Sequence, residues 1–96
     1  MLTREEIEHR LKKLKPYLVD KYHIDKIAYF GSFATGKAHR KSDLDVLVEF
    51  KKPLGWEFFD LQELLEKELG TKIDLVSVKA LKSQLKDVIL KQAQYI

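Results

Sequence analysis

The pattern of apolar positions changes period along the chain. Near the N-terminus the apolar residues that recur at intervals of three and four are Ile7, Leu11, Leu14 and Leu18. This spacing predicts an amphipathic helix, and Thr3 with Glu6 has the spacing of a capping box at its start. Pro16 lacks a backbone donor and disfavours helix at the preceding residue, so we expect a break or kink there.

Three short apolar runs further along predict β-strands, at Ile24–Phe30, Val46–Phe50 and Thr71–Val76. Between the last two, the segment Trp56–Leu69 carries its apolar residues on one helical side, and Gly70 is suited to end that helix. A final helix is predicted from the apolar residues Leu81, Leu85, Val88, Ile89 and Ala93. Strands that alternate with helices indicate an α/β (α+β) layer structure.

Composition narrows the class of protein. We expect a single domain, residues 1–96, with 45% hydrophobic residues and no cysteine, which excludes disulfides and thiolate zinc sites. No apolar run approaches the ~20 residues that span a bilayer, and the charged N-terminus is no signal peptide, so we expect a cytoplasmic protein away from membranes. The net charge of +3 is too mild to indicate nucleic-acid binding.

The candidate chemistry is concentrated in the middle of the chain. Gly31-Ser32 directly follows the first apolar run, and such a turn offers backbone amides, with the serine hydroxyl, to a phosphate. Asp43 and Asp45 precede the second run. Alternate side chains of a strand share a face, with alpha carbons about 6.8 Å apart. Two carboxylates so arranged can converge on one hard cation, or on two cations ~3.5–4 Å apart.

Asp74 is the third acid of interest, because it lies inside the apolar run Thr71–Val76. A carboxylate buried there needs a partner or a metal. If that strand neighbours the Asp45 strand, three carboxylates would cluster, and a cation or a shared proton would relieve their repulsion. Oxygen ligands favour Mg²⁺ or Mn²⁺, with a nucleoside triphosphate supplying further ligands. The alternative is an ordinary turn at Gly31-Ser32, with separate acids that cap, face solvent or pair with lysine.

Two segments together resemble a known signature. They are Gly31-Ser32-Phe33-Ala34-Thr35-Gly36 and, after five residues, Ser42-Asp43-Leu44-Asp45-Val46-Leu47-Val48. This resembles the G-S-x-A-R-G…S-D-x-D-hydrophobic pattern of the polymerase-β nucleotidyltransferase superfamily, and Asp74 in K-I-D-L-V falls where that family has its third acid. The chain resembles the minimal nucleotidyltransferases over nearly its whole length, in particular MntA-type antitoxins encoded beside HEPN-domain ribonuclease toxins. The resemblance implies the nucleotidyltransferase fold, with a small three-stranded mixed sheet flanked by about four helices.

The resemblance also implies an activity. It is Mg²⁺-dependent transfer of AMP from ATP to a protein acceptor, expected to be a tyrosine of a cognate HEPN toxin, with pyrophosphate leaving. Asp43 and Asp45 would hold two Mg²⁺ ions, with Mn²⁺ as the alternative metal. Asp74 would complete the metal ligands and assist deprotonation of the acceptor hydroxyl. The residues expected to bind the nucleotide are Gly31, Ser32 and Ser42.

One residue departs from the family pattern, since Thr35 stands where an arginine is usual. This favours, as an alternative, an antitoxin that neutralises its partner by binding without catalysis. Three nearby basic residues could compensate for the missing arginine, or could simply face solvent: Lys37, Arg40 and Lys41. A further alternative is transfer to a small molecule or an RNA end. We expect neither that nor stable nucleic-acid binding, because the fold uses nearly all residues and leaves none for a second domain.

Aromatic residues at the start of the helix Trp56–Leu69 are candidates for a partner-binding patch. We expect Phe58 and Phe59 to pack in the core, and Trp56, which lies beside Gly55, to be partly exposed. The terminal pair Tyr95-Ile96 is apolar enough to pack on the sheet or on a partner.

Overall fold

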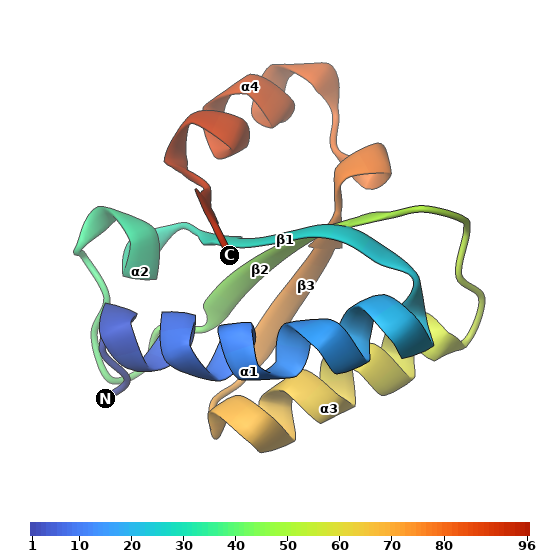
Figure 1. The fold of residues 1–96 in the computed structure, drawn as a ribbon. Coiled ribbons are helices and arrows are strands. Elements are labelled where there is room, and N and C mark those ends of the chain that lie inside the picture. Colours follow the sequence, from blue (N-terminus) through green and yellow to red (C-terminus); the bar gives the residue numbers. More distant parts are fainter.

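A computed structural model of the protein describes all residues, 1–96, and arranges helices on both sides of one sheet (Figure 1). The helices are α1 (Arg4–Tyr22), α2 (Ser32–Thr35), α3 (Glu57–Leu69) and α4 (Ser83–Gln92), with a 3₁₀ helix η1 (Val78–Ala80). The strands are β1 (Ile24–Phe30), β2 (Leu44–Phe50), β3 (Ile73–Ser77) and β4 (Gln94–Tyr95). The α/β class and the four helices agree with the sequence-based expectation.

The sheet has the strand order β3-β2-β1-β4 and is mixed. β1 runs antiparallel to both β2 and β4, whereas β2 and β3 are parallel and are joined through α3. The expected three-stranded sheet therefore has a fourth strand, because Gln94 and Tyr95 pair with Tyr29 and Ala28 of β1. A two-residue strand carries no detectable alternation, and its pairing depends on α4 returning the chain to the sheet.

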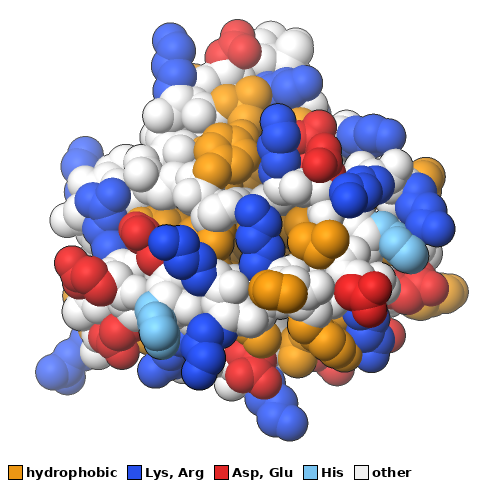
Figure 2. Space-filling model, viewed as in Figure 1, with side chains coloured by type: hydrophobic (Ala, Val, Ile, Leu, Met, Phe, Trp, Pro, Cys, Tyr) orange, Lys and Arg blue, Asp and Glu red, His pale blue; other side chains and the backbone are white.

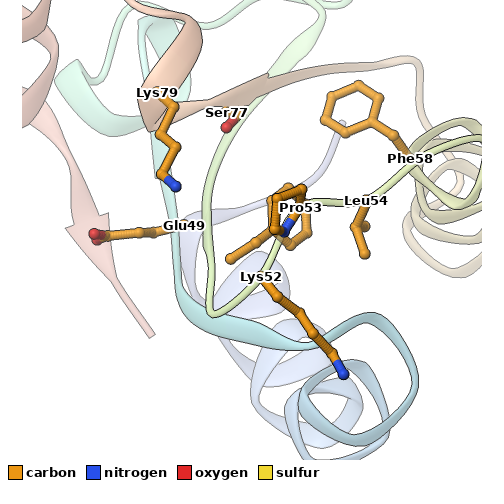
Figure 3. Close-up of a pocket in the computed structure, with 8 residues that line it drawn as sticks. Glu49, Lys52, Pro53, Leu54, Phe58, Ser77 and Lys79 are labelled. Atoms are coloured by element: carbon orange, nitrogen blue, oxygen red, sulfur yellow. The ribbon is translucent and has the colours of Figure 1, made fainter.

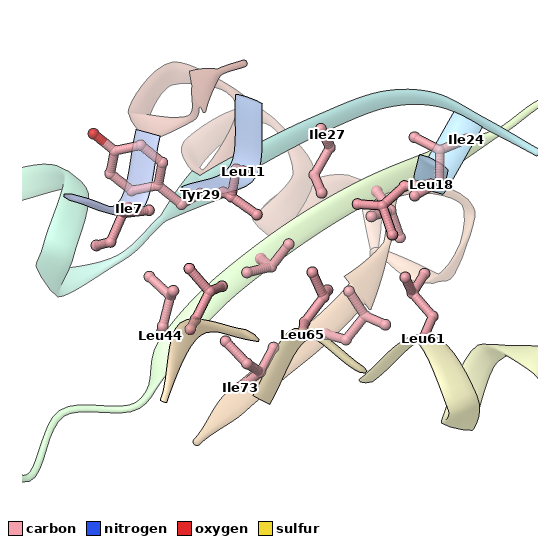
Figure 4. Close-up of a cluster of buried hydrophobic side chains, with 14 of the residues drawn as sticks. Ile7, Leu11, Leu18, Ile24, Ile27, Tyr29, Leu44, Leu61, Leu65 and Ile73 are labelled. Atoms are coloured by element: carbon pink, nitrogen blue, oxygen red, sulfur yellow. The ribbon is translucent and has the colours of Figure 1, made fainter. Parts of the chain in front are cut away.

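The main hydrophobic core lies between the sheet and the layer formed by α1 and α3 (Figure 4). It contains 17 buried residues, including Leu44, Val46 and Val48, which alternate along β2. The opposite face of the sheet buries only three residues, Ala28, Phe30 and Leu47, beneath η1 and α4. The two faces of the sheet are thus very unequally packed. Because side chains alternate along a strand, every second residue of β1, β2 and β3 lies on the lightly packed face.

Helix α1 begins with the predicted capping box, in which Thr3 accepts from the Glu6 amide and the Glu6 side chain accepts from the Thr3 amide. A break or kink was predicted at Pro16, and the break is wrong, because α1 continues through Pro16 to Tyr22. A kink at this position stays a prediction. An interior proline costs a helix about 3 kcal/mol. Burial of Leu18 and Tyr22 beyond it offsets this cost, since each buried large side chain contributes about 1.5–3 kcal/mol.

Several apolar residues are more exposed than expected. Phe59 was expected in the core but is 58% exposed. The expected exposure of Trp56, the residue before α3, is confirmed at 84%. Phe58 is half-buried against the main core, as expected. On α4, Leu85 and Val88 face solvent, because the helix uses Ile89 and Leu90 to cover the small cluster on the sheet.

The surface carries charges of both signs. Lys and Arg side chains are interspersed with Asp and Glu over the face shown in Figure 2, with no single basic patch. None of the helices combines the length and the hydropathy that a membrane crossing requires.

Candidate functional site

Two of the candidate acids, Asp45 and Asp74, lie directly opposite each other in the sheet. They are register partners in the parallel pair of β2 and β3, so their alpha carbons are separated by about one strand spacing, ~4.8 Å. The residues that flank them along the chain are all buried in the main core: Leu44, Val46, Ile73 and Leu75. Because side chains alternate along a strand, both carboxylates project from the other face, which also carries α4.

Asp43 lies just outside the sheet. The sequence suggested that it would share a strand with Asp45, but β2 begins at Leu44 and Asp43 is exposed in the preceding loop. Its negative charge still reaches Asp45. The three acids do not form a ready three-residue group around one metal position. The structure therefore brings Asp45 and Asp74 together, with Asp43 at the margin of the pair.

Crowding of these carboxylates changes the acidity of Asp45. The pKa of Asp45 is raised from 3.8 to about 6, most strongly by burial and further by the charge of Asp74, a hydrogen bond between the two carboxyl groups and the charge of Asp43. Such a pair is stabilised by a shared proton or by a cation. The donors are all carboxylate oxygens, a set that fits a hard divalent ion and does not distinguish Mg²⁺ from Mn²⁺.

Gly31 brings the turn after β1 against the Asp45 carboxylate. Its φ of +73° is unfavourable for other residues, and a Cβ added there would lie 2.1 Å from Asp45 Oδ2. The register explains this contact, because Phe30, the residue before Gly31, pairs with Asp45 across β1 and β2. The turn predicted to hold phosphate and the predicted metal ligand are thus in direct contact, and only glycine fits between them.

Thr35 fixes the orientation of the Gly31 peptide group. The Gly31 carbonyl accepts three hydrogen bonds, from the Ala34 amide at 3.0 Å, the Thr35 amide at 3.0 Å and the Thr35 hydroxyl at 3.1 Å. Sequence reasoning missed this role and treated Thr35 only as a lost arginine. A threonine four residues after a carbonyl commonly bonds back to it, so the spacing of Thr35 from Gly31 was the available signal.

A second anchor for this turn comes from α1. Tyr29, which is fully buried, donates its hydroxyl proton to Glu8 Oε2 at 2.5 Å and accepts from Arg4 Nε at 3.3 Å. Both partners lie in the first half of α1, whereas Tyr29 lies two residues before Gly31. The network therefore ties α1 to the end of β1 where the turn begins.

The two candidate serines have different surroundings. Ser32 is half-buried as the first residue of α2, next to Gly31. Ser42 closes a turn in the following loop, where its amide donates to the His39 carbonyl and its hydroxyl accepts from the His39 amide, both at 2.9 Å. It lines a cavity of about 390 Å³ against α1 and α3. The structure groups Ser32 with the acids through Gly31, whereas Ser42 shapes the basic loop; contact of either with a nucleotide stays a prediction.

Comparison with known proteins identifies the family to which this arrangement belongs. Residues 11–96 match the family described as nucleotidyltransferase domain. The chain is similar to protein adenylyltransferase MntA of Thermococcus cleftensis, with 39% identity over an alignment of 97 residues that covers 100% of this chain and 98% of the relative.

Solved structures give the same assignment. The structure of a proposed minimal nucleotidyltransferase superposes with a TM-score of 0.83 at 30% identity, covering 97% of this chain and 95% of the other. A toxin–antitoxin crystal structure with AMP-PNP superposes with a TM-score of 0.76 at 28% identity, covering 92% of this chain and 70% of the other. The chain therefore belongs to the nucleotidyltransferase domain family and is an enzyme that transfers nucleotidyl groups.

Proposed function

We propose that this enzyme transfers AMP from ATP to a hydroxyl group of a partner protein, and that it thereby acts as the antitoxin of a toxin–antitoxin pair. The observation that carries the proposal is the register pair Asp45–Asp74 beside the Gly31 turn. A relative with 39% identity is named a protein adenylyltransferase. Another similar chain comes from a toxin–antitoxin structure with AMP-PNP, an analogue of ATP.

In this proposal the acids hold the metal and the turn holds the nucleotide. Asp45 and Asp74 would bind a divalent cation through their carboxylate oxygens, and the negative charge of Asp43 in the adjoining loop would add to the attraction. The bound cation would neutralise triphosphate charge and lower the pKa of the attacking hydroxyl. Gly31 lets the backbone approach the phosphates closely, and the Ser32 hydroxyl adds a donor.

The transfer step needs no covalent intermediate on the enzyme. The acceptor oxygen forms a bond to the α-phosphorus of ATP while the bond from that phosphorus to the pyrophosphate oxygen breaks. We assign Asp74, the more exposed member of the pair, to accept the proton from the acceptor hydroxyl. The pyrophosphate leaves with its negative charge, and neutralisation of that charge together with in-line alignment of the acceptor and leaving oxygens provides most of the rate enhancement.

A protein acceptor suits the openness of the site. None of the cavities of the structure is lined by the three acids. Asp74 and Asp43 are exposed, and Asp45 is half-buried. A small acceptor molecule would find few enclosing walls there, whereas a protein acceptor brings its own surface to cover an open face.

The test uses the purified chain with the protein encoded in the adjacent reading frame, ATP labelled at the α-phosphate, and Mg²⁺. We expect label on the partner with the wild-type enzyme, and a loss of about 10²–10⁴-fold or more with Asp45→Asn or Asp74→Asn. Asp25→Asn changes an exposed aspartate at the opposite end of the sheet and serves as the matched control. Mg²⁺ with ATP should also raise the melting temperature of the wild type and not of Asp45→Asn. Full labelling by both site variants would refute the proposal.

A second candidate function is neutralisation by binding alone. The observation in its favour is Thr35, whose hydroxyl is engaged with the Gly31 carbonyl and which brings no cation to the phosphates. The same experiment separates the two functions. Inhibition of the partner without transferred label, and unchanged in Asp45→Asn, would support binding alone.

A further inference from the structure

The start of α3 carries an exposed aromatic pair far from the candidate site. Trp56 is 84% exposed and Phe59 is 58% exposed, and their ring centroids lie 5.9 Å apart with an interplanar angle of 39°. Large exposed aromatic groups of this kind mark interaction sites. We infer that this end of α3 is a self-association surface, through which two copies of the chain form a two-fold symmetric dimer.

The aromatic pair is held in place by a series of ring contacts. Phe59 contacts Phe58 edge-on at 6.0 Å, and Phe58 contacts Phe50 of β2 edge-on at 6.3 Å. Phe58 and Phe50 both pack against the main core. The exposed rings are therefore supported from the sheet outward, and a supported ring loses less conformational entropy on docking than a free side chain.

A cavity at the ends of β2 and β3 is lined by Phe58, the ring that contacts Phe59 (Figure 3). Its volume is about 240 Å³, and its apolar lining comes from Phe50, Leu54 and Phe58. Lys79 and Glu49 lie across from the apolar residues, and Lys52 adds a second cation. Pockets for small-molecule ligands usually measure about 300–1,000 Å³, so this cavity is better matched to one large side chain, such as an indole.

The surface is complementary to itself in shape and in charge. It presents an aromatic knob, formed by the rings of Trp56 and Phe59. Next to the knob is the cavity, which the Trp56 and Phe59 rings of the same molecule do not line. A two-fold axis between them would seat each Trp56 in the cavity of the other copy. The acids Glu57 and Asp60 flank the knob, whereas the cavity is lined by two cations, Lys52 and Lys79, and one acid, Glu49, so the acidic flank of each copy would meet a cavity of net positive charge. This charge arrangement favours a second copy over an unrelated partner.

Dimerisation through this surface leaves the nucleotidyl-transfer site open. Asp45 lies near the start of β2, and the cavity begins at Glu49, four residues along the strand, which is about 13 Å. The two sites therefore lie at opposite ends of the sheet (Figure 1). The inference is independent of the acceptor that the enzyme modifies.

Trp56 is the only tryptophan of the protein, so its intrinsic fluorescence reports directly on this surface. Light scattering after gel filtration would give the mass, and tryptophan emission the exposure of Trp56, from about 1 to 100 µM full-length protein. We expect the mass to rise from 11.3 kDa towards twice that value, and the emission to shift to shorter wavelength over the same concentration range.

Three variants locate the interface. Trp56→Ala and Phe59→Ala should weaken association by about 30-fold or more, as expected for interface hot spots. Leu85→Ala removes a similarly exposed apolar side chain on α4 and should leave the dimer intact. Far-ultraviolet circular dichroism should be unchanged in all three, because each side chain is mostly exposed.

Three results would overturn the inference. The first is a mass of 11.3 kDa with solvent-exposed emission at every concentration. The second is a dimer that persists undiminished in Trp56→Ala, which would put the contact elsewhere. The third is a dimer lost in Leu85→Ala, which would assign the contact to α4.

Discussion

At the scale of single residues, the site depends on one close contact between backbone and side chain. The Asp45 carboxylate occupies the space where any residue other than glycine at position 31 would carry its Cβ. Three hydrogen bonds to the Gly31 carbonyl hold the peptide in that position, two of them from Thr35. Substitutions at Gly31 and Asp45 should therefore show coupled effects.

Gly31→Ala should be more harmful than the same change at another glycine with positive φ. Gly36 has a φ of +77° with nothing within 4 Å of an added Cβ, whereas the Cβ at Gly31 would meet Asp45 at 2.1 Å. We expect Gly36→Ala to cost about 1–2 kcal/mol, and Gly31→Ala roughly 2–5 kcal/mol because overpacking adds to the same backbone strain. Urea denaturation measures both. Equal losses would show that the contact with Asp45 imposes no cost.

Asp45→Asn should stabilise the metal-free protein at neutral pH. The fold raises the pKa of Asp45 to about 6, so its contribution to stability is full below the unfolded value near pH 4 and is lost as pH rises through about 6. Asparagine stays uncharged throughout. Because Asp45 is only half-buried, we expect a gain of about 1 kcal/mol, or ~4–8 °C in melting temperature.

The comparison requires a chelator and two pH values. Melting temperatures of both proteins in EDTA should differ at pH 7.5 and agree at pH 4. A variant that is less stable than the wild type at pH 7.5 would contradict the assigned crowding of Asp45 with Asp74.

At the scale of elements, the sequence pattern correctly predicted those features that depend only on neighbouring residues. The bounds of β1 followed from its apolar run, and the α1 cap followed from Thr3 and Glu6. The sequence also identified Asp45 and Asp74 as candidates, but only conditionally, because the register of two parallel strands is a long-range property. β4 was not predicted because its pairing with β1 is likewise a long-range property. The break at Pro16 was wrong because packing on both sides of the proline outweighed its local cost.

Pro16→Ala should therefore stabilise the protein. Pro16 lies inside α1 and is exposed, so the change restores a backbone donor without disturbing the core. Alanine is about 3 kcal/mol more favourable in a helix interior, while the freer unfolded chain takes back about 0.4–1 kcal/mol. We expect a net gain of roughly 1–3 kcal/mol in thermal or urea unfolding. Unchanged stability would mean that α1 is distorted at this position to accommodate the ring.

At the scale of the whole molecule, the two sides of the sheet differ in strength. The side covered by α1 and α3 has 17 buried residues in its core, whereas the side covered by α4 has three. No residue of α4 is fully buried. Local stability follows the density of buried apolar contacts, so α4 and β4 should open more readily than the rest of the fold.

Native-state hydrogen exchange can measure this difference. Amides in α4 and β4 should exchange by local opening, at lower free energy than amides in β1, β2 and the middle of α1. The slowest amides should report global unfolding. Protection of α4 equal to that of β2 would show that the small cluster of Ala28, Phe30 and Leu47 is as cooperative as the main core.

The pairing of Asp45 with Asp74 also bears on when the enzyme first becomes active during its synthesis. The first carboxylate leaves the ribosome 29 residues before the second, and the two meet only when β3 has joined β2 in parallel. A slip of one residue in that pairing would turn Asp74 to the opposite face. If the two acids act as proposed, a nascent or misregistered chain would be inert, and the appearance of activity would report that β3 has joined the sheet in the correct register.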